Sequence, residues 1–344
     1  MRFLIANLTV FCLISVAHAD DGWVEVTGGS ACLIQEHPTI SMADEYVLIE
    51  MMPDKYKVTA AFNFYNAGES TSVAVGFPVS GNAEYKKSSF ISFKTWVNGH
   101  RVATTNYQDS ATGDELEYSY YKVKKVQFLG KSTTTSVVEY EAPYGHSVGP
   151  VQWVAYNYST GRSWKGPIGK VVIDLRFQEG LLGLHPVDDS LKLSHRAKGQ
   201  MIFEASNLKP EAPNRFYVDF NPMEQCLTQA VRKHESVNAY CSSIAGWIGK
   251  PSQEKDLLGD SAKQPTLGVL RLRRNALYAK YGRVFKDQQL SNFFSNMNWY
   301  SPRPYFKESD LTESDRESVA DISRLEKSIE SAKVFPIPFS IPRD

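Results

Sequence analysis

The sequence predicts an α+β fold in separate domains, with an N-terminal antiparallel β-sandwich-like domain at residues 20–222 and a small all-α module at residues 264–332. From about residue 24 to residue 220, apolar side chains recur at every second position between turn residues, which is typical of half-buried strands. After residue 264 the apolar residues follow the three- and four-residue steps of helices. Successive strands without intervening helices favour an antiparallel sandwich, either one or two small ones in series.

The alternation defines the strands in order along the chain. Residues 57–66 place Val58, Ala60, Phe62 and Phe64 on one face of a strand, and the same pattern recurs in residues 71–79, 134–142, 151–158, 170–177 and 214–220. Residues 90–107 contain Asn98-Gly99, the strongest hairpin signal in the chain, because a type I′ turn needs positive φ at two successive residues. Two basic runs, residues 122–125 and 271–274, are expected to be solvated faces.

The segment from residue 223 to residue 263 is expected to be a helical connector that ends in a polar linker. It contains Cys226 and Cys241, which are predicted to form a disulfide. A single straight helix would hold their Cα atoms on the order of 20 Å apart, so the bond requires a chain reversal between them. Cys32 is then left as a spare thiol or as a partner for an intermolecular bond.

Three local signals predict the helices of the second domain. A first helix should end at Gly282, because glycine suits the left-handed position that follows many helices. Asp287 is placed to cap a second short helix, and Thr312 with Asp315 resembles a capping box. The third helix should bury one stripe of side chains, Val319, Ile322, Leu325 and Ile329. Residues 333–344 form a proline-rich tail that is expected to be extended.

The N-terminus predicts export. Arg2 precedes a continuous apolar run, and Ala17-His18-Ala19 has the small residues of a cleavage site, so residues 1–19 are expected to be a cleavable signal peptide. The protein is therefore expected in the periplasm or secreted, with no transmembrane anchor. Its 38 basic and 38 acidic side chains balance, which argues against nucleic acid as a partner. No cofactor is expected, and the oligomeric state stays open.

Residues 274–300 carry a family resemblance. Arg274-Asn275, the run Tyr278-Ala279-Lys280-Tyr281-Gly282, Phe285, Leu290, Phe293 or Phe294, and Trp299-Tyr300 resemble the YARHG domain, a small bacterial extracytoplasmic module named after its Tyr-Ala-Arg-His-Gly core. Lys280 and Tyr281 replace the arginine and the histidine, which argues against an acid-base role at that position. Through residues 40–50, Phe77-Pro78 and residues 160–170, the preceding β region resembles a family of bacterial secreted domains of unknown function. The resemblance implies an architecture and a compartment and supplies no catalytic residue.

Aromatic side chains are the candidate binding residues. Trp299, Tyr300 and Tyr305 lie near a proline-broken loop and either fill the core of the module or form an exposed platform for a sugar or peptide. Trp164 lies in the loop of residues 160–170 and is either a binding residue or folded onto the sandwich. Arg274, four residues before Tyr278, is placed for a cation-π contact within the helix.

One cluster offers an alternative chemistry. His185, Asp188, Asp189 and His195 are the best candidates for a metal or acid-base site, although aspartates in such a loop more often cap turns. His234-Glu235 lacks the second histidine of a zinc protease motif, because Asn238 occupies that position. The sequence thus predicts a non-enzymatic cell-envelope protein that binds a cell-wall component or an envelope protein, with a hydrolase that uses residues 185–195 as the alternative.

Overall fold

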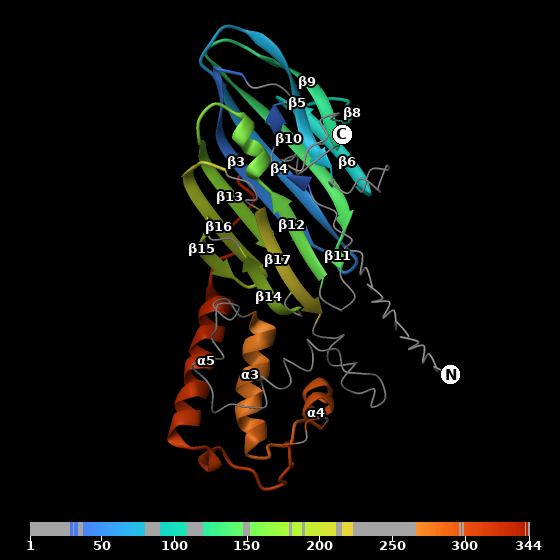
Figure 1. Ribbon diagram of the computed structural model, residues 1–344. Helices are drawn as coiled ribbons and strands as arrows, with labels where there is room; N and C mark the ends of the chain where they lie inside the picture. The colour runs from blue at the N-terminus through green and yellow to red at the C-terminus, as the bar shows by residue number, and fades with distance from the viewer. Residues whose placement is uncertain are drawn as a thin grey trace, which may run out of the picture.

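The protein combines a large β domain with a helical module at one end (Figure 1). The computed structural model describes residues 28–29, 31–33, 37–79, 90–108, 120–146, 152–178, 181–187, 190–210, 215–222, 266–295, 297, 299–340 and 342. The cysteines of the predicted disulfide, Cys226 and Cys241, and the predicted signal peptide lie outside these residues. Within the described residues no helix is long and apolar enough to cross a membrane.

A large sheet forms the back of the β domain. Its described strands are ordered β15-β16-β13-β3-β4-β10-β6-β7. Their bounds are Lys192–Ala197, Gln200–Leu208, Ile168–Arg176, Ile40–Met51, Lys55–Asn66, Ser132–Pro143, Ser92–Val97 and His100–Arg101, in the same order. The central strands β3, β4 and β10 have 12 residues each, so they are longer than the short strands that the sequence predicts.

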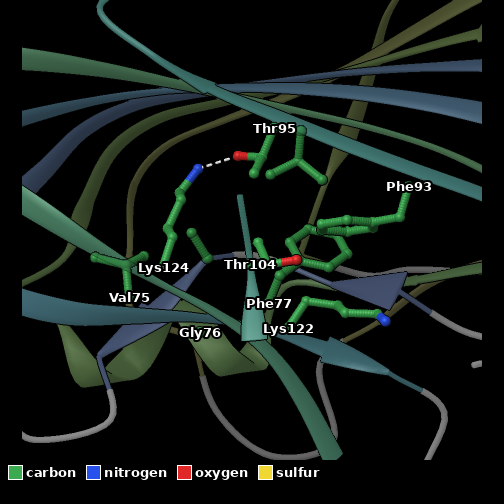
Figure 2. Close-up of a pocket in the computed structure, with 10 residues that line it drawn as sticks. Val75, Gly76, Phe77, Phe93, Thr95, Thr104, Lys122 and Lys124 are labelled. Atoms are coloured by element: carbon green, nitrogen blue, oxygen red, sulfur yellow. Dashed lines mark hydrogen bonds between the residues drawn. The ribbon is translucent and has the colours of Figure 1, made fainter. Parts of the chain in front are cut away.

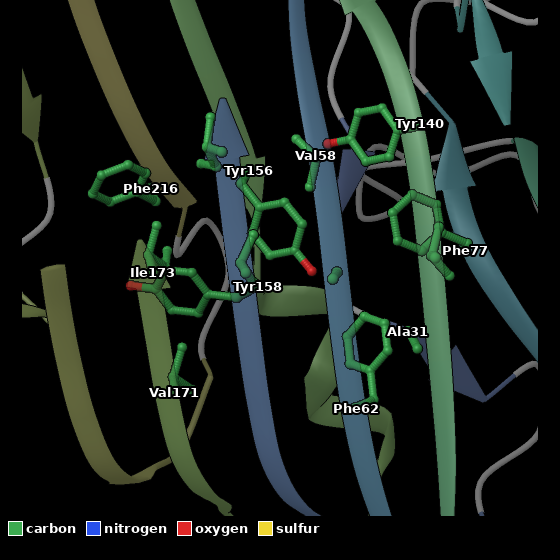
Figure 3. Close-up of a cluster of buried hydrophobic side chains, with 14 of the residues drawn as sticks. Ala31, Val58, Phe62, Phe77, Tyr140, Tyr156, Tyr158, Val171, Ile173 and Phe216 are labelled. Atoms are coloured by element: carbon green, nitrogen blue, oxygen red, sulfur yellow. The ribbon is translucent and has the colours of Figure 1, made fainter. Parts of the chain in front are cut away.

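Two smaller sheets pack on the large one. The first is ordered β2-β5-β9-β8, with bounds Cys32–Leu33, Thr71–Val79, Tyr120–Phe128 and Thr105–Gln108. The second is ordered β1-β12-β17-β14, with bounds Gly28–Gly29, Gln152–Asn157, Arg215–Pro222 and Leu181–Val187, and β11 (Gly145–His146) pairs with β12. One continuous apolar core joins all three sheets, because Phe62, Phe77 and Phe216 belong to the same cluster (Figure 3). The β domain is therefore a single sandwich.

The pairing within the sandwich confirms the predicted hairpin and adds two parallel pairs to the predicted antiparallel arrangement. Asn98 and Gly99 have φ values of 49° and 80°, so the predicted hairpin turn between β6 and β7 is confirmed. The sandwich is mostly antiparallel, but β13 pairs with β3 in parallel, and so does β1 with β12. Parallel neighbours need a long connection through the rest of the fold, and alternation along the chain carries no information about such a partner.

The helical module contains α3 (Leu267–Lys280), α4 (Gln288–Ser295) and α5 (Glu313–Ser331). Its predicted boundaries are confirmed: Gly282 has a φ of 84°, the Leu290 amide donates to Asp287 Oδ1 at 3.0 Å, and the Asp315 amide donates to Thr312 Oγ1 at 3.2 Å. The predicted stripe on α5 is wrong in part, because Ile329 is buried but Leu325 is 41% exposed. The ends of α3 and α5 contact β14 and β15 of the β domain (Figure 1).

Candidate functional site

The YARHG-like run ends α3 and enters the core of the helical module. Tyr278 and Ala279 are buried beside Phe294, which fixes the end of the helix against α4. Gly282 is required here, because a Cβ on it would lie 2.6 Å from the Ser301 carbonyl oxygen. The expected cation-π contact is formed by a different residue: Arg283 lies 4.5 Å above the Tyr278 ring, whereas Arg274 pairs with a glutamate of α5.

Lys280 and Tyr281, the two variant positions of the run, converge on the start of α5. Lys280 Nζ donates to Asp315 Oδ2 at 2.9 Å, and the Tyr281 hydroxyl donates to the same oxygen. Partial burial alone would raise the pKa of the Asp315 carboxyl, but these two hydrogen bonds and the Lys280 charge outweigh it and hold the pKa below its ordinary 3.8. This cluster therefore ties the end of α3 to the first turn of α5.

We expect Asp315→Asn to lower the free energy of local opening of the first turns of α5 by about 1–3 kcal/mol. The reason is that charge-assisted hydrogen bonds to a partly buried acid are lost. In the wild type this contribution is present above pH 3.8 and is lost as the pH falls through the lowered pKa of the folded protein. Hydrogen exchange of residues 312–331 measures it. Asp321→Asn is the control, since this exposed acid lies on the same helix and should leave exchange unchanged; equal exchange in both variants would contradict the role of Asp315.

The predicted aromatic platform divides into core and surface. Trp299 and Tyr300 are half-buried against Phe294, and the Tyr300 hydroxyl donates to the Arg283 carbonyl at 2.8 Å. Tyr305 is 90% exposed. Of the three residues, Tyr305 is thus the one that offers a whole ring to a ligand, and the other two support the loop that carries it.

The loop of residues 301–305 has backbone anchors on both sides of Tyr305. The Arg303 amide donates to the Gly282 carbonyl at 2.7 Å, and the Phe306 amide donates to the Arg303 carbonyl at 3.2 Å. Pro302 and Pro304 restrict the backbone further. Arg303 and Lys307, two residues before and two residues after Tyr305, are both exposed. The anchored backbone therefore presents Tyr305 with an exposed cation two residues before it and another two residues after it.

Trp164 is a core residue, so its candidacy as a binding residue is wrong. It follows a short 3-10 helix, Ser159–Ser163, and only 3% of it is exposed. Its Nε1 donates to the Ala31 carbonyl at 2.6 Å, and its ring lies 4.2 Å from that of Phe64. The loop that carries it is structural, because Ser163 Oγ accepts from the Leu33 amide of β2 and the Lys165 amide donates to the Ile40 carbonyl of β3.

The candidate metal residues are placed in different sheets. His185 lies on β14, where its backbone is in register with Asp219 of β17. His195 lies on β15 of the large sheet. His195 Nε2 lies 2.8 Å from the Lys333 carbonyl, so its ring is engaged by the C-terminal tail. Asp188 and Asp189 lie outside the described residues. Among the residues that are described, no group of three acids, histidines or cysteines is close enough to hold a metal ion.

A buried lysine was missed by the sequence analysis. Lys124 lies at the base of a small pocket between the large sheet and the β2-β5-β9-β8 sheet (Figure 2). Its Nζ donates to Thr95 Oγ1 and, at 2.7 Å, to Ser136 Oγ, and burial lowers its pKa to about 7. The run 122–125 is therefore not a uniformly solvated face. The available signal was alternation, because Lys124 shares the inward face of β9 with Val126 and Phe128.

Cys32 is a free cysteine in the core. It is 6% exposed, its Sγ lies 3.5 Å from the Gly76 carbonyl oxygen, and burial raises the pKa of the thiol to about 12. The thiolate is the reactive form, so this side chain is chemically inert at neutral pH. Its surroundings suit a small apolar residue and leave no room for an intermolecular bond.

The fold defines a class of architecture, a β-sandwich followed by a small helical module. Residues 251–327 match the YARHG domain, which confirms the family resemblance of the second domain, and the β-rich region precedes it. A solved structure from Legionella pneumophila, named a "putative nutrient binding protein", has a similar fold, with a TM-score of 0.54 and 18% identity over 88% of this chain and 99% of that chain. The comparison with curated proteins finds no match.

Proposed function

We propose that this protein is a non-enzymatic binding protein of the bacterial cell envelope, exported to the periplasm or secreted, whose β-sandwich is a scaffold for the contact surface of its YARHG domain. The observation that carries the proposal is the loop of residues 301–305. Tyr305 is 90% exposed there, on a backbone held by hydrogen bonds and prolines. The similarity of the whole chain to a protein named for nutrient binding supports a binding role.

The chemistry of the loop suits recognition. Tyrosine and arginine are enriched among residues that dominate binding energy, because each offers a large contact area together with hydrogen-bond donors. A loop that is already rigid loses little conformational entropy when it binds. The exposed Arg303 and Lys307, each two residues from Tyr305 along the chain, add positive charge, which favours a partner with acidic groups. A cell-wall component or an envelope protein with an exposed acidic surface fits these properties.

Tyr305→Ala is expected to reduce binding to purified cell wall or to envelope extract by about tenfold or more, as for the loss of a binding hot spot. The fold should be unaffected, since substitutions at exposed positions change stability by about 0.5 kcal/mol or less. Co-sedimentation with cell wall and retention of envelope proteins on the immobilised full chain measure the effect.

The matched control is Tyr107→Ala, which removes an aromatic ring that is 39% exposed on β8, at the end of the β domain far from the helices (Figure 1). Tyr305→Phe separates the ring from its hydroxyl and should keep most of the binding if stacking dominates. Equal retention of the wild type, Tyr305→Ala and Tyr107→Ala on every fraction would reject the loop as the contact surface.

A further inference from the structure

The C-terminal segment, residues 333–339, lies on the outer face of the large sheet, opposite the core. In Figure 1 its red trace leaves α5 and passes β15 and β16. The side chains that hold it come from β3, β13, β15 and β16, and we call them the tail site: Tyr46, Asp174, Arg176, His195 and Gln200. On β13 the odd-numbered Ile173 and Leu175 point into the core, so Asp174 and Arg176 face outward.

The tail site contacts the backbone of one tail residue at both of its polar groups. Gln200 Oε1 accepts from the Phe335 amide at 2.8 Å, and Gln200 Nε2 donates to the Phe335 carbonyl at 3.2 Å. Arg176 Nη2 donates to the same carbonyl at 3.0 Å. One side-chain amide therefore replaces the partner strand that an extended peptide would otherwise need.

A buried aspartate orients these donors. Asp174 is fully buried and accepts from Gln200 Nε2 at 2.9 Å, from Arg176 Nη2 at 2.9 Å and from the Tyr46 hydroxyl at 2.7 Å. Gln200 is also fully buried. The carboxylate holds the glutamine and the arginine in the orientation that meets the peptide, because each donates to it through the same group that reaches Phe335. The donors are thus fixed by the sheet itself.

The rest of the contact suits an extended, proline-flanked peptide. The His195 and Phe335 rings lie 4.3 Å apart, and the Phe339 ring meets the edge of Tyr46 at 5.3 Å. Pro336 and Pro338 lack amide hydrogens, so this stretch cannot pair as an ordinary strand. Proline also biases the preceding residue toward extended backbone, which reduces the entropy lost when such a peptide binds.

We propose that the tail site is a receptor for an extended, proline-flanked peptide with an aromatic residue before proline, and that the protein's own residues 333–339 are a tethered ligand in it. The segment is held at a few points and is otherwise exposed, since Phe335 is 42% and Val334 49% exposed. A segment held in this way opens locally at low cost, so a free peptide of the same chemistry can displace it. Displacement would release the chain that follows α5 from the β domain. This inference is independent of the loop at residues 301–305.

Trypsin tests whether the tail is docked in the full-length protein. His195 holds the Lys333 carbonyl, so cleavage after Lys333 should be slow in the wild type. Phe335→Pro removes the ring and the amide that Gln200 binds, and we expect it to release the peptide that starts at Val334 about tenfold faster. Gln200→Ala should act in the same direction, while Gln108→Ala, on an exposed edge strand, should match the wild type. Equal cleavage rates in all four proteins would overturn the docking.

Peptide binding in trans tests the receptor. A fluorescently labelled peptide of residues 332–342 should bind the full-length Phe335→Pro chain about tenfold or more tightly than the wild type, because the tethered tail competes at a millimolar effective concentration. Adding Gln200→Ala or, on the half-buried rim, His195→Ala to that chain should weaken the binding. The same peptide with proline at position 335 should not bind. Absence of binding to the Phe335→Pro chain, or binding that neither added variant weakens, would overturn the proposal.

Discussion

Trp164→Ala is expected to lower the free energy of unfolding of the β domain by about 3–5 kcal/mol, the cost of truncating a buried aromatic. The side chain is 3% exposed, packs against the rings of Phe64 and Phe128, and donates its indole hydrogen to the Ala31 carbonyl. Its removal opens a cavity and takes away the indole N–H that this carbonyl accepts from. Guanidinium unfolding followed by far-ultraviolet circular dichroism measures the change.

Two further variants sharpen this result. Trp164→Phe keeps most of the ring but loses the hydrogen bond to Ala31, so it should cost about 1–3 kcal/mol. Tyr65→Ala removes a ring that is 40% exposed from the neighbouring strand β4 and should cost clearly less than Trp164→Ala. If Trp164→Ala unfolds at the same denaturant concentration as the wild type, the loop is not part of the core.

Lys124→Met is expected to remove a pH dependence of stability above neutral pH. Lys124 titrates at about pH 7 in the folded protein and near its ordinary 10.5 in the unfolded chain, because burial disfavours the charged amine. Between these values the unfolded chain binds more protons, so the wild type should gain about 1.4 kcal/mol of stability per pH unit as the pH rises. The contribution is fully present above pH 10.5 and is lost as the pH falls through 7.

At pH 7 and below, Lys124→Met should therefore be more stable than the wild type by several kcal/mol, offset in part by the lost hydrogen bonds to Thr95 and Ser136. The difference between the two proteins should shrink as the pH approaches 10. The control is Lys125→Met, the exposed neighbour on β9, which should follow the wild type at every pH. Parallel stability curves for Lys124→Met and the wild type would show that the lysine is charged in both states.

Local signals in the sequence determined the elements of this protein. The turn at Asn98-Gly99 forms because these residues tolerate positive φ. The helix boundary at Gly282 follows from its positive φ, and those at Asp287 and Thr312 follow from side chains that accept from the amide three residues further on. Alternation placed Asp174 and Arg176 on one face of their strand and Ile173 and Leu175 on the other. These features depend on neighbours along the chain, so the sequence alone was enough to predict them.

The candidate sites depended on the tertiary structure. Tyr305 and Trp299 are both aromatics near prolines in the sequence. Only the tertiary structure shows that Trp299 packs against the core with Phe294, whereas Tyr305 is exposed. Alternation could place Lys124 on the same face of β9 as Val126 and Phe128, but the facing sheet is what buries it.

The tail site joins strands that are far apart in the sequence with residues 333–339, and the parallel pairing of β13 with β3 brings Asp174 next to Tyr46. Strand pairing arises from contacts between distant segments, and these contacts form because they bury apolar surface over the whole chain. No local sequence pattern therefore predicts which strands pair.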